Sequence, residues 1–143
     1  MTVLFSGLVS SITSLIVTSV INILFQYRNS KKRLDDTLMQ LNQLMLNNPF
    51  LENDNSLERY LKREKIDKNE LCDKYNIFCI MKYNYLEDYC RFYKFNISRI
   101  KKHIHLKEYL GDNKEWWSKN RTINYEAYEK KFIHIIEEVV NEA

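Results

Sequence analysis

The stretch LCDKYNIFCIMKYNYLEDYCRFYKF, residues 71–95, decides the fold of this chain. Its aromatic, aliphatic and cysteine side chains recur every three or four residues, which is the spacing of the buried face of an α-helix. They form two adjacent stripes, and together these are wider than the single apolar face of a surface helix. We therefore predict a central helix that other helices contact on several sides. One stripe contains Leu71, Tyr75, Phe78, Tyr85, Tyr89 and Phe92, and the other contains Cys72, Cys79, Tyr83, Leu86, Cys90 and Tyr93.

The three cysteines of the chain all lie in this stretch. On a helix, Cys72 and Cys79 are separated by about 10 Å along the axis, and Cys79 and Cys90 by about 16 Å. Those separations are too long for a disulfide or for a shared metal ion. We expect three reduced thiols in a buried stripe, with no metal site and no other cofactor.

Polar residues mark the ends of further helices. Ser56 is the expected N-cap of SLERYLKREKI, and Asp67 with Glu70 forms a capping-box pattern before the central helix. Asn96 is the expected N-cap of ISRIKKHIHLKEYL, which ends at Gly111, and NYEAYEKKFIHIIEEVV predicts the last helix. The chain has only two Gly and one Pro, too few for the turns of a sandwich or barrel. We therefore predict an all-α fold.

The first 27 residues contain no charged side chain. The apolar run within them, residues 3–25, exceeds the ~20 residues that span a hydrocarbon core. A cleaved signal peptide would need a basic start and a small-residue cleavage site, and the sequence has neither. We predict a single uncleaved transmembrane helix that continues to Asn48, where the following Pro49 ends it.

This layout predicts three parts: a transmembrane helix (1–27), a cytosolic extension of the same helix (28–48) and a cytoplasmic helical domain (49–143). Four basic residues directly follow the apolar run, and the positive-inside rule places such a cluster on the cytoplasmic side. The short N-terminal end is then expected outside. The cluster consists of Arg28, Lys31, Lys32 and Arg33.

Small and polar residues gather on one side of the predicted transmembrane helix when the sequence is placed at about 100° per residue. Bulky residues such as Ile12, Ile16 and Ile23 occupy the opposite side. A small hydroxylated face lets helices approach closely in lipid, and the same face could line a narrow pore in a ring of helices. Helix packing and a pore are two alternatives, and a plain anchor is a third. The face consists of Ser6, Gly7, Ser10, Ser14, Thr18 and Asn22.

No catalytic pattern occurs in the sequence. His103 and His105 are two residues apart, so on a helix they point in nearly opposite directions and cannot share a metal. The acid pairs Glu87–Asp88 and Glu137–Glu138 are interpreted as solvated residues without partners. The net charge of +3 is small for a nucleic-acid-binding protein, and aromatic residues at helical spacing are typical of a core. We expect neither an enzyme nor a nucleic-acid partner.

The stretches NNPFLENDN, YNIFCIMKYNYLEDYCRFY and HLKEYLGDNKEWW, with the following YEAYEKKF, lie within residues 47–133. They resemble a loosely defined group of small bacterial proteins with one N-terminal membrane helix and an all-helical cytoplasmic domain. The layout is also similar to accessory membrane effectors of bacterial antiviral systems of the CRISPR type. This resemblance implies an inner-membrane protein that oligomerises and perturbs the membrane after infection is sensed.

The sequence therefore favours a homo-oligomeric inner-membrane effector of antiphage defence that acts by permeabilising or depolarising the membrane. Its expected partners are the lipid bilayer, further copies of the chain and a cytosolic protein of the same defence system. One alternative is a non-enzymatic adaptor that anchors a cytosolic partner at the membrane. Another is a helical domain that senses nucleic acid or a nucleotide.

Overall fold

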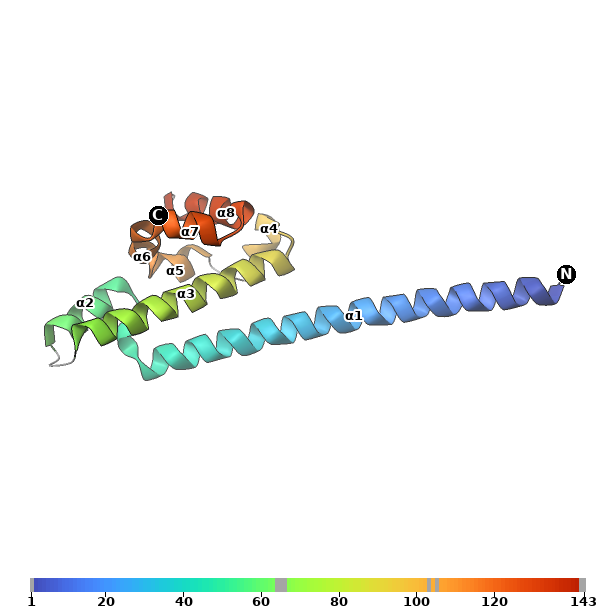
Figure 1. Ribbon diagram of the computed structural model, residues 1–143, viewed down its shortest axis with the longest axis horizontal. Helices are drawn as coiled ribbons and strands as arrows, with labels where there is room; N and C mark the ends of the chain where they lie inside the picture. Colours follow the sequence, from blue (N-terminus) through green and yellow to red (C-terminus); the bar gives the residue numbers. More distant parts are fainter. Residues whose placement is uncertain (1, 64–66, 103, 105, 142–143) are drawn as a thin grey trace. The chain divides into compact units, whose positions relative to one another are not determined.

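The computed structural model describes residues 2–63, 67–102, 104 and 106–141, without the side chains of residues 2–12, 63, 106–107, 111 and 140–141. The described residues form helices and no strand, which confirms the all-α prediction for this part of the chain (Figure 1). The chain divides into two compact units, Met1–Asp35 and Asp36–Ala143. The helices are α1 (Thr2–Asn47), the 3-10 helix η1 (Pro49–Leu51), α2 (Asp54–Arg63), α3 (Lys68–Phe92), α4 (Ile97–Ile100), α5 (Leu106–Gly111), α6 (Lys114–Lys119), α7 (Arg121–Ala127) and α8 (Lys130–Asn141).

Helix α1 is continuous from Thr2 to Asn47, as predicted for the apolar run and its extension. Asn48 ends it by bonding back to the last turn: its Nδ2 donates to the carbonyl of Leu44 at 3.0 Å, and its backbone N–H donates to Met45 at 3.2 Å. Pro49 then opens η1, where a missing backbone N–H costs no hydrogen bond.

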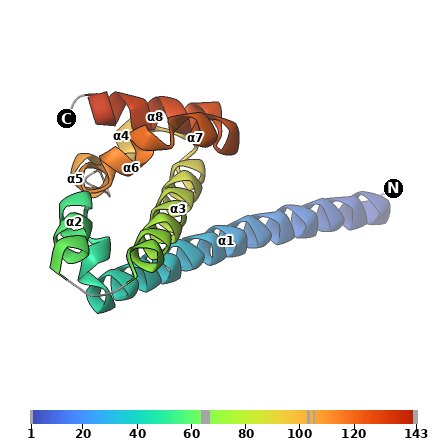
Figure 2. The same cartoon turned by 60° about the vertical axis from the view of Figure 1, so that its left-hand side comes forward.

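The second unit is built around α3, the predicted central helix. Figures 1 and 2 show α5–α8 on one side of α3, and α2 beside its N-terminal half. Both predicted stripes contribute to the core, although Cys72, Phe92 and Tyr93 at its margins are only half-buried. The residues of α3 that are buried are Leu71, Tyr75, Phe78, Cys79, Lys82, Tyr83, Tyr85, Leu86, Tyr89 and Cys90.

Aromatic rings join α3 to the helices that cover it. The fully buried Tyr83 ring lies 5.4 Å from the Trp116 ring and 4.7 Å from the Trp117 ring, measured between centroids. Trp117 in turn meets Phe132 of α8 edge-on at 6.1 Å. Such pairs contribute about 0.5–1.5 kcal/mol each beyond the area they bury, so they tie α6 and α8 to the central helix.

The predicted start of α3 is confirmed. Asp67 is its N-cap, and the side chain accepts a hydrogen bond from the backbone N–H of Asn69 at 2.9 Å. Glu70, which the capping-box pattern pairs with the cap, bonds Lys74 one turn later at 2.6 Å. The exposed ammonium is within reach of this carboxylate because the two residues are four apart on one helix face.

The prediction that Ser56 caps α2 is wrong. The helix begins two residues earlier, and Asn53 accepts the capping hydrogen bond from the backbone N–H of Ser56 at 2.8 Å. Ser56 is buried inside the first turn, where its hydroxyl accepts from Arg59 at 3.1 Å. Asn and Ser are equally good caps, so local sequence did not separate them.

Two predicted helices are each split in two. Asn96 caps α4 as predicted, accepting from the Arg99 N–H at 3.0 Å, but α4 ends at Ile100 and a separate α5 ends at Gly111. Ile100 and Leu110 are both fully buried on the two sides of this break. The predicted last helix is interrupted at Tyr128, whose backbone is extended (φ −108°, ψ 157°), and resumes as α8.

The chain leaves α3 through two residues in the left-handed region, Lys94 (φ 54°) and Phe95 (φ 55°). This turn satisfies carbonyl groups at the helix end, because the Phe95 N–H donates to Cys90 at 2.7 Å and the Lys94 N–H donates to Arg91 at 2.9 Å. Left-handed backbone is costly for a residue with a Cβ atom and nearly free for glycine.

We predict that Lys94→Gly raises the free energy of unfolding by about 1 kcal/mol, because glycine removes this backbone cost. Urea titration followed by tryptophan fluorescence measures the change, since both tryptophans lie in the second unit. Asp73→Gly, at an exposed position inside α3, is the control and should lower stability by about 1 kcal/mol. A loss of stability in both variants would contradict the strained turn.

The three cysteines are free thiols, as predicted, but they differ in exposure. Cys79 and Cys90 have no exposed surface, and burial raises the pKa of each thiol to about 12. Cys72 is only half-buried.

We predict that iodoacetamide at pH 8 modifies Cys72 alone in the native protein, because the reagent attacks thiolates and the other two thiols are enclosed and protonated. Mass spectrometry of the digested protein identifies the modified residue. The same reaction in urea should modify all three cysteines. Rapid modification of Cys79 or Cys90 without urea would show that the α3 core is open.

Candidate functional site

The predicted polar face lies on α1. The side chains of Ser6, Gly7 and Ser10 are outside the described residues. Its other three members, Ser14, Thr18 and Asn22, are exposed and follow one another every fourth residue, so they form one stripe along the helix.

Large apolar side chains cover the rest of this helix surface between residues 15 and 25, which we call the apolar belt. Each is at least half exposed, from 50% for Val20 to 68% for Leu15. At about 100° per residue they surround roughly three quarters of the circumference. A helix that is apolar nearly all round is typical of a membrane span or of a helix enclosed by other helices. The belt consists of Leu15, Ile16, Val17, Val20, Ile21, Ile23, Leu24 and Phe25.

A hydroxyl within the belt is satisfied by its own helix. Ser19 Oγ donates to the carbonyl of Leu15 at 2.8 Å. Serine that bonds back to the preceding turn exposes no unpaired donor, so it is tolerated in an apolar environment. Ser19 therefore does not conflict with an apolar surrounding of α1.

The predicted basic cluster follows the belt on the same helix, and the side chains of Arg28, Lys31, Lys32 and Arg33 are all exposed. Where side chains are described, no helix is long and apolar enough to cross a membrane. The predicted span begins at residue 3, and the side chains of residues 3–12 lie outside that part of the chain. The transmembrane assignment therefore stays a prediction.

A chain of hydrogen bonds runs through the core of the second unit. Lys82 Nζ donates to Asn113 Oδ1 at 2.6 Å, and Asn113 Nδ2 donates to the Tyr75 hydroxyl at 2.7 Å. That hydroxyl donates to Asp54 Oδ1 at 2.9 Å. The Tyr83 hydroxyl donates to the Asn113 backbone carbonyl at 3.2 Å. The network connects α2, α3 and the turn between α5 and α6.

Burial dominates the electrostatics of this network. It lowers the pKa of Lys82 from 10.5 to about 8, although Asp112 acts in the opposite direction. It also raises the pKa of the Asp54 carboxyl, which the hydrogen bond from Tyr75 partly offsets. The Lys82 ammonium lies 4.4 Å from the centroid of the Tyr109 ring, a cation–π contact that replaces part of its lost hydration.

The network's position indicates a structural role. Asn113 has no exposed surface and Lys82 is 4% exposed. Among the described side chains no buried nitrogen or oxygen lacks a hydrogen bond. None of Lys82, Asn113 and Asp54 lines the two cavities described below. A fully satisfied polar network specifies how helices pack, because any shift would leave a buried group unpaired.

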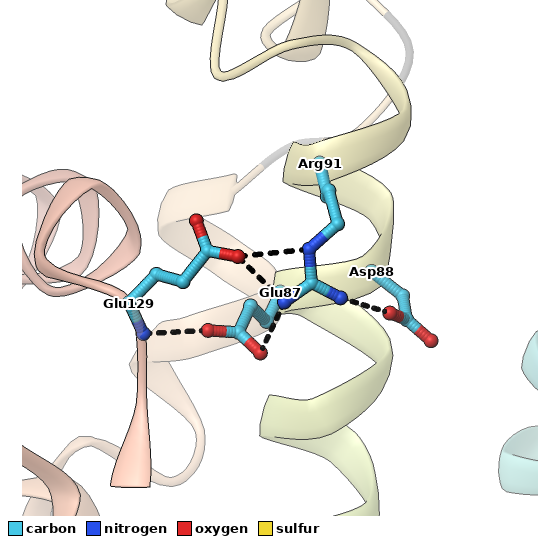
Figure 3. Close-up of polar contacts among 4 residues, drawn as sticks. All are labelled: Glu87, Asp88, Arg91 and Glu129. Atoms are coloured by element: carbon cyan, nitrogen blue, oxygen red, sulfur yellow. Dashed lines mark hydrogen bonds and ion pairs between the residues drawn. The ribbon is translucent and has the colours of Figure 1, made fainter. Parts of the chain in front are cut away.

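The interpretation of Glu87 and Asp88 as acids without partners is wrong (Figure 3). Arg91 Nε and Nη2 both donate to Glu129 Oε1, at 2.9 and 2.8 Å, and Arg91 also pairs with Asp88 at 2.9 Å and with Glu87 at 3.2 Å. Glu87 Oε1 accepts the backbone N–H of Glu129 at 2.7 Å. A carboxylate of α3 thus bonds the residue that precedes α8, where negative charge is favourable.

Glu137 also has partners, contrary to the sequence interpretation. Its Oε1 accepts from the Trp117 indole at 3.0 Å, and its Oε2 accepts from Arg121 at 2.6 Å. The carboxylate is 16% exposed and connects α6, α7 and α8. Pairs this far apart in sequence leave no local signal.

No three His, Cys, Asp or Glu side chains among the described residues are close enough to hold a metal ion. His103 and His105 lie outside the described residues.

Two cavities open on the second unit. The smaller, about 260 Å³, is mainly apolar and lies between the end of α1, η1 and α3, with Leu44, Phe50 and Ile77 among its lining. The larger, about 490 Å³, lies between α3, α6 and α7, and we call it the amide groove. Asparagine side chains of α3, of α7 and of the turn between α6 and α7 line it: Asn76, Asn84, Asn120 and Asn124.

Comparison with known proteins finds no matching family model, no similar curated protein and no solved structure of similar fold. The apolar belt, the basic cluster and the amide groove are the surface features of the described residues that bear on function.

We predict that Lys82 makes stability increase with pH. Below pH 8 the folded and unfolded states both hold the lysine proton, and between 8 and 10.5 the unfolded state holds it more, so the free energy of unfolding rises. The difference between the wild type and Lys82→Met should grow by about 2 kcal/mol from pH 7.5 to pH 10. The buried tyrosines, whose pKa values burial raises, are common to both proteins, so their contribution cancels in this difference.

Urea titrations across this pH range measure the effect. Loss of the Asn113 hydrogen bond in Lys82→Met adds a constant offset and leaves the slope intact. Lys74→Met removes an exposed ammonium of the same helix and is the matched control. A difference for Lys82→Met that does not exceed the one for Lys74→Met at pH 10 would show that Lys82 is hydrated.

Proposed function

We propose that this protein is a homo-oligomeric membrane effector whose α1 helix inserts into the bacterial inner membrane and whose second unit lies in the cytoplasm. The observation that carries the proposal is the apolar belt, in which every side chain is at least half exposed. Covering such side chains contributes on the order of 1 kcal/mol each, so the eight together favour transfer out of water by several kcal/mol.

The distribution of side chains supports lipid as the environment. A helix that packs in a soluble bundle has one apolar stripe and one polar face. In α1 the apolar surface is the wide one, and the polar stripe of Ser14, Thr18 and Asn22 is narrow. The uncharged run up to Tyr27 and the exposed basic residues from Arg28 onward fit a span followed by a cytoplasmic flank.

The narrow polar stripe supports self-association of the inserted helices. Asn22 cannot satisfy both ends of its amide within one apolar helix as simply as a serine can, so a second helix is its natural partner in lipid. Interhelical hydrogen bonds in membranes contribute about 0.6 kcal/mol on average, and a ring of copies repeats the contact. Such a ring would permeabilise or depolarise the membrane, and the resemblance in layout suggests antiphage defence as its setting.

The second candidate function is a membrane adaptor that holds a cytosolic partner. The amide groove favours it, because Ile80 and Ile123 in its lining are 45% and 66% exposed. An adaptor uses the same anchor but leaves the membrane potential unchanged. Neither function requires a catalytic residue.

We predict that the protein stays with membranes after carbonate extraction and that induced expression depolarises cells. A potential-sensitive dye and a permeability dye measure the effect. Ser14→Leu combined with Thr18→Leu should keep the protein in the membrane and abolish depolarisation, because leucine fills the space of the polar stripe. The control replaces Ile16 and Ile23 by valine and should change neither readout.

Extraction of the protein by carbonate would refute the membrane proposal. Membrane retention with no depolarisation by the wild type would favour the adaptor. A reporter fused after Ala143 should be active in the cytoplasm only, and periplasmic activity would reverse the proposed orientation.

A further inference from the structure

The amide groove lacks charge in a chain rich in charge. Charged residues make up 29% of the sequence, yet none of the nine residues that line the groove is Asp, Glu, Lys or Arg. A charged ligand would be desolvated there without an opposite charge to pair with. The groove therefore selects an uncharged surface.

Asn76 on one wall of the groove and Asn120 and Asn124 on the other leave opposite ends of their amide groups unpaired. On α3, Asn76 Oδ1 accepts from the Trp116 indole at 3.0 Å, and the Asn76 Nδ2 donors make no other bond among the described residues. On the other wall, the Nδ2 groups of Asn120 and Asn124 donate to backbone carbonyls of Trp116 and Trp117. The Oδ1 atoms of Asn120 and Asn124 accept no hydrogen bond among the described residues. Asn76 thus leaves an amide donor unpaired on one wall, and Asn120 and Asn124 leave amide acceptors unpaired on the other, while Asn84 on the α3 wall makes no side-chain hydrogen bond among the described residues.

We propose that the amide groove is a self-association surface that docks on the same groove of a second copy of this chain. A two-fold axis that runs along the groove places each patch against its own copy, with Asn76 of one subunit opposite Asn120 and Asn124 of the other. The exposed Ile80 and Ile123 supply the apolar contact between them. Two copies with net charge +3 repel each other, and a face without charge is where that repulsion is smallest.

The size of the groove makes this contact weak by itself. Nine residues line it, whereas a stable interface has about 20–30 residues on each side. Anchoring both copies in one membrane raises their effective concentration and strengthens a weak contact. The inference thus rests on the proposed membrane assembly, in which the second unit would add cytoplasmic contacts to those of α1.

Cysteine cross-linking in isolated membranes tests the interface. The protein carries Cys72→Ser, which removes the partly exposed native thiol, and Ile123→Cys. A short bis-maleimide should link Ile123→Cys into a dimer, because residues near a two-fold axis meet their own copies. Ile77→Cys, which is 58% exposed in the wild type on the same helix as Ile80 but outside the groove, is the matched control and should give at least about tenfold less dimer.

A second variant tests the groove itself. Ile80→Asp added to Ile123→Cys places a charge in the groove and should reduce the dimer by about tenfold or more, whereas Ile77→Asp should leave it unchanged. Tryptophan fluorescence checks that Ile80→Asp remains folded. The proposal is overturned if Ile123→Cys gives no dimer, if Ile77→Cys gives as much, or if Ile80→Asp has no effect.

Carbonate extraction of the same membranes separates this inference from the proposed function. A chain that is retained but not cross-linked refutes the groove interface and leaves the membrane anchor intact. A chain that is extracted refutes the anchor. Cross-linking of the purified full chain at high concentration then decides the groove by the same comparison of Ile123→Cys with Ile77→Cys.

Discussion

The side chain of Asn113 is the contact on which the packing of the second unit depends. It accepts from Lys82 at 2.6 Å, donates to Tyr75 at 2.7 Å and has no exposed surface. A buried amide that satisfies a lysine and a tyrosine at once has one arrangement in which all groups are paired. The turn between α5 and α6 is therefore held on α3 at one position, and the Asp54 carboxylate holds α2 to the same network.

Charged side chains around this network make further contacts between the helices of the second unit. Arg91 and Glu87 hold the break between α7 and α8, and Glu137 connects three helices. Exposed ion pairs contribute only about 0–1 kcal/mol each to the stability of the fold, so these contacts orient helices more than they stabilise them. The core itself comes from the aromatic rings that surround Tyr83.

The two units satisfy their apolar side chains in different ways. The second unit encloses its large side chains, and Trp117, Tyr83 and Phe132 are almost or fully buried. The first unit leaves the apolar belt of α1 exposed. The proposed membrane insertion would account for this contrast, since lipid would then cover the belt.

The sequence by itself determined the all-α class, the continuous α1 that ends before Pro49, the central α3 with its Asp67 cap, and the stripe of Ser14, Thr18 and Asn22. Each of these follows from the spacing of apolar residues or from a capping residue, and both signals can be recognised within a few residues of sequence without knowing the fold. Only the tertiary structure decided where the predicted helices break. Ile100 and Leu110 are fully buried on the two sides of one break, and at the other break Glu129 bonds Glu87, 42 residues away. The Lys82–Asn113 bond joins residues 31 apart, and Arg91 and Glu129 are 38 apart. A lysine in a helix ordinarily predicts a solvated surface, and only packing on every side makes it a buried donor.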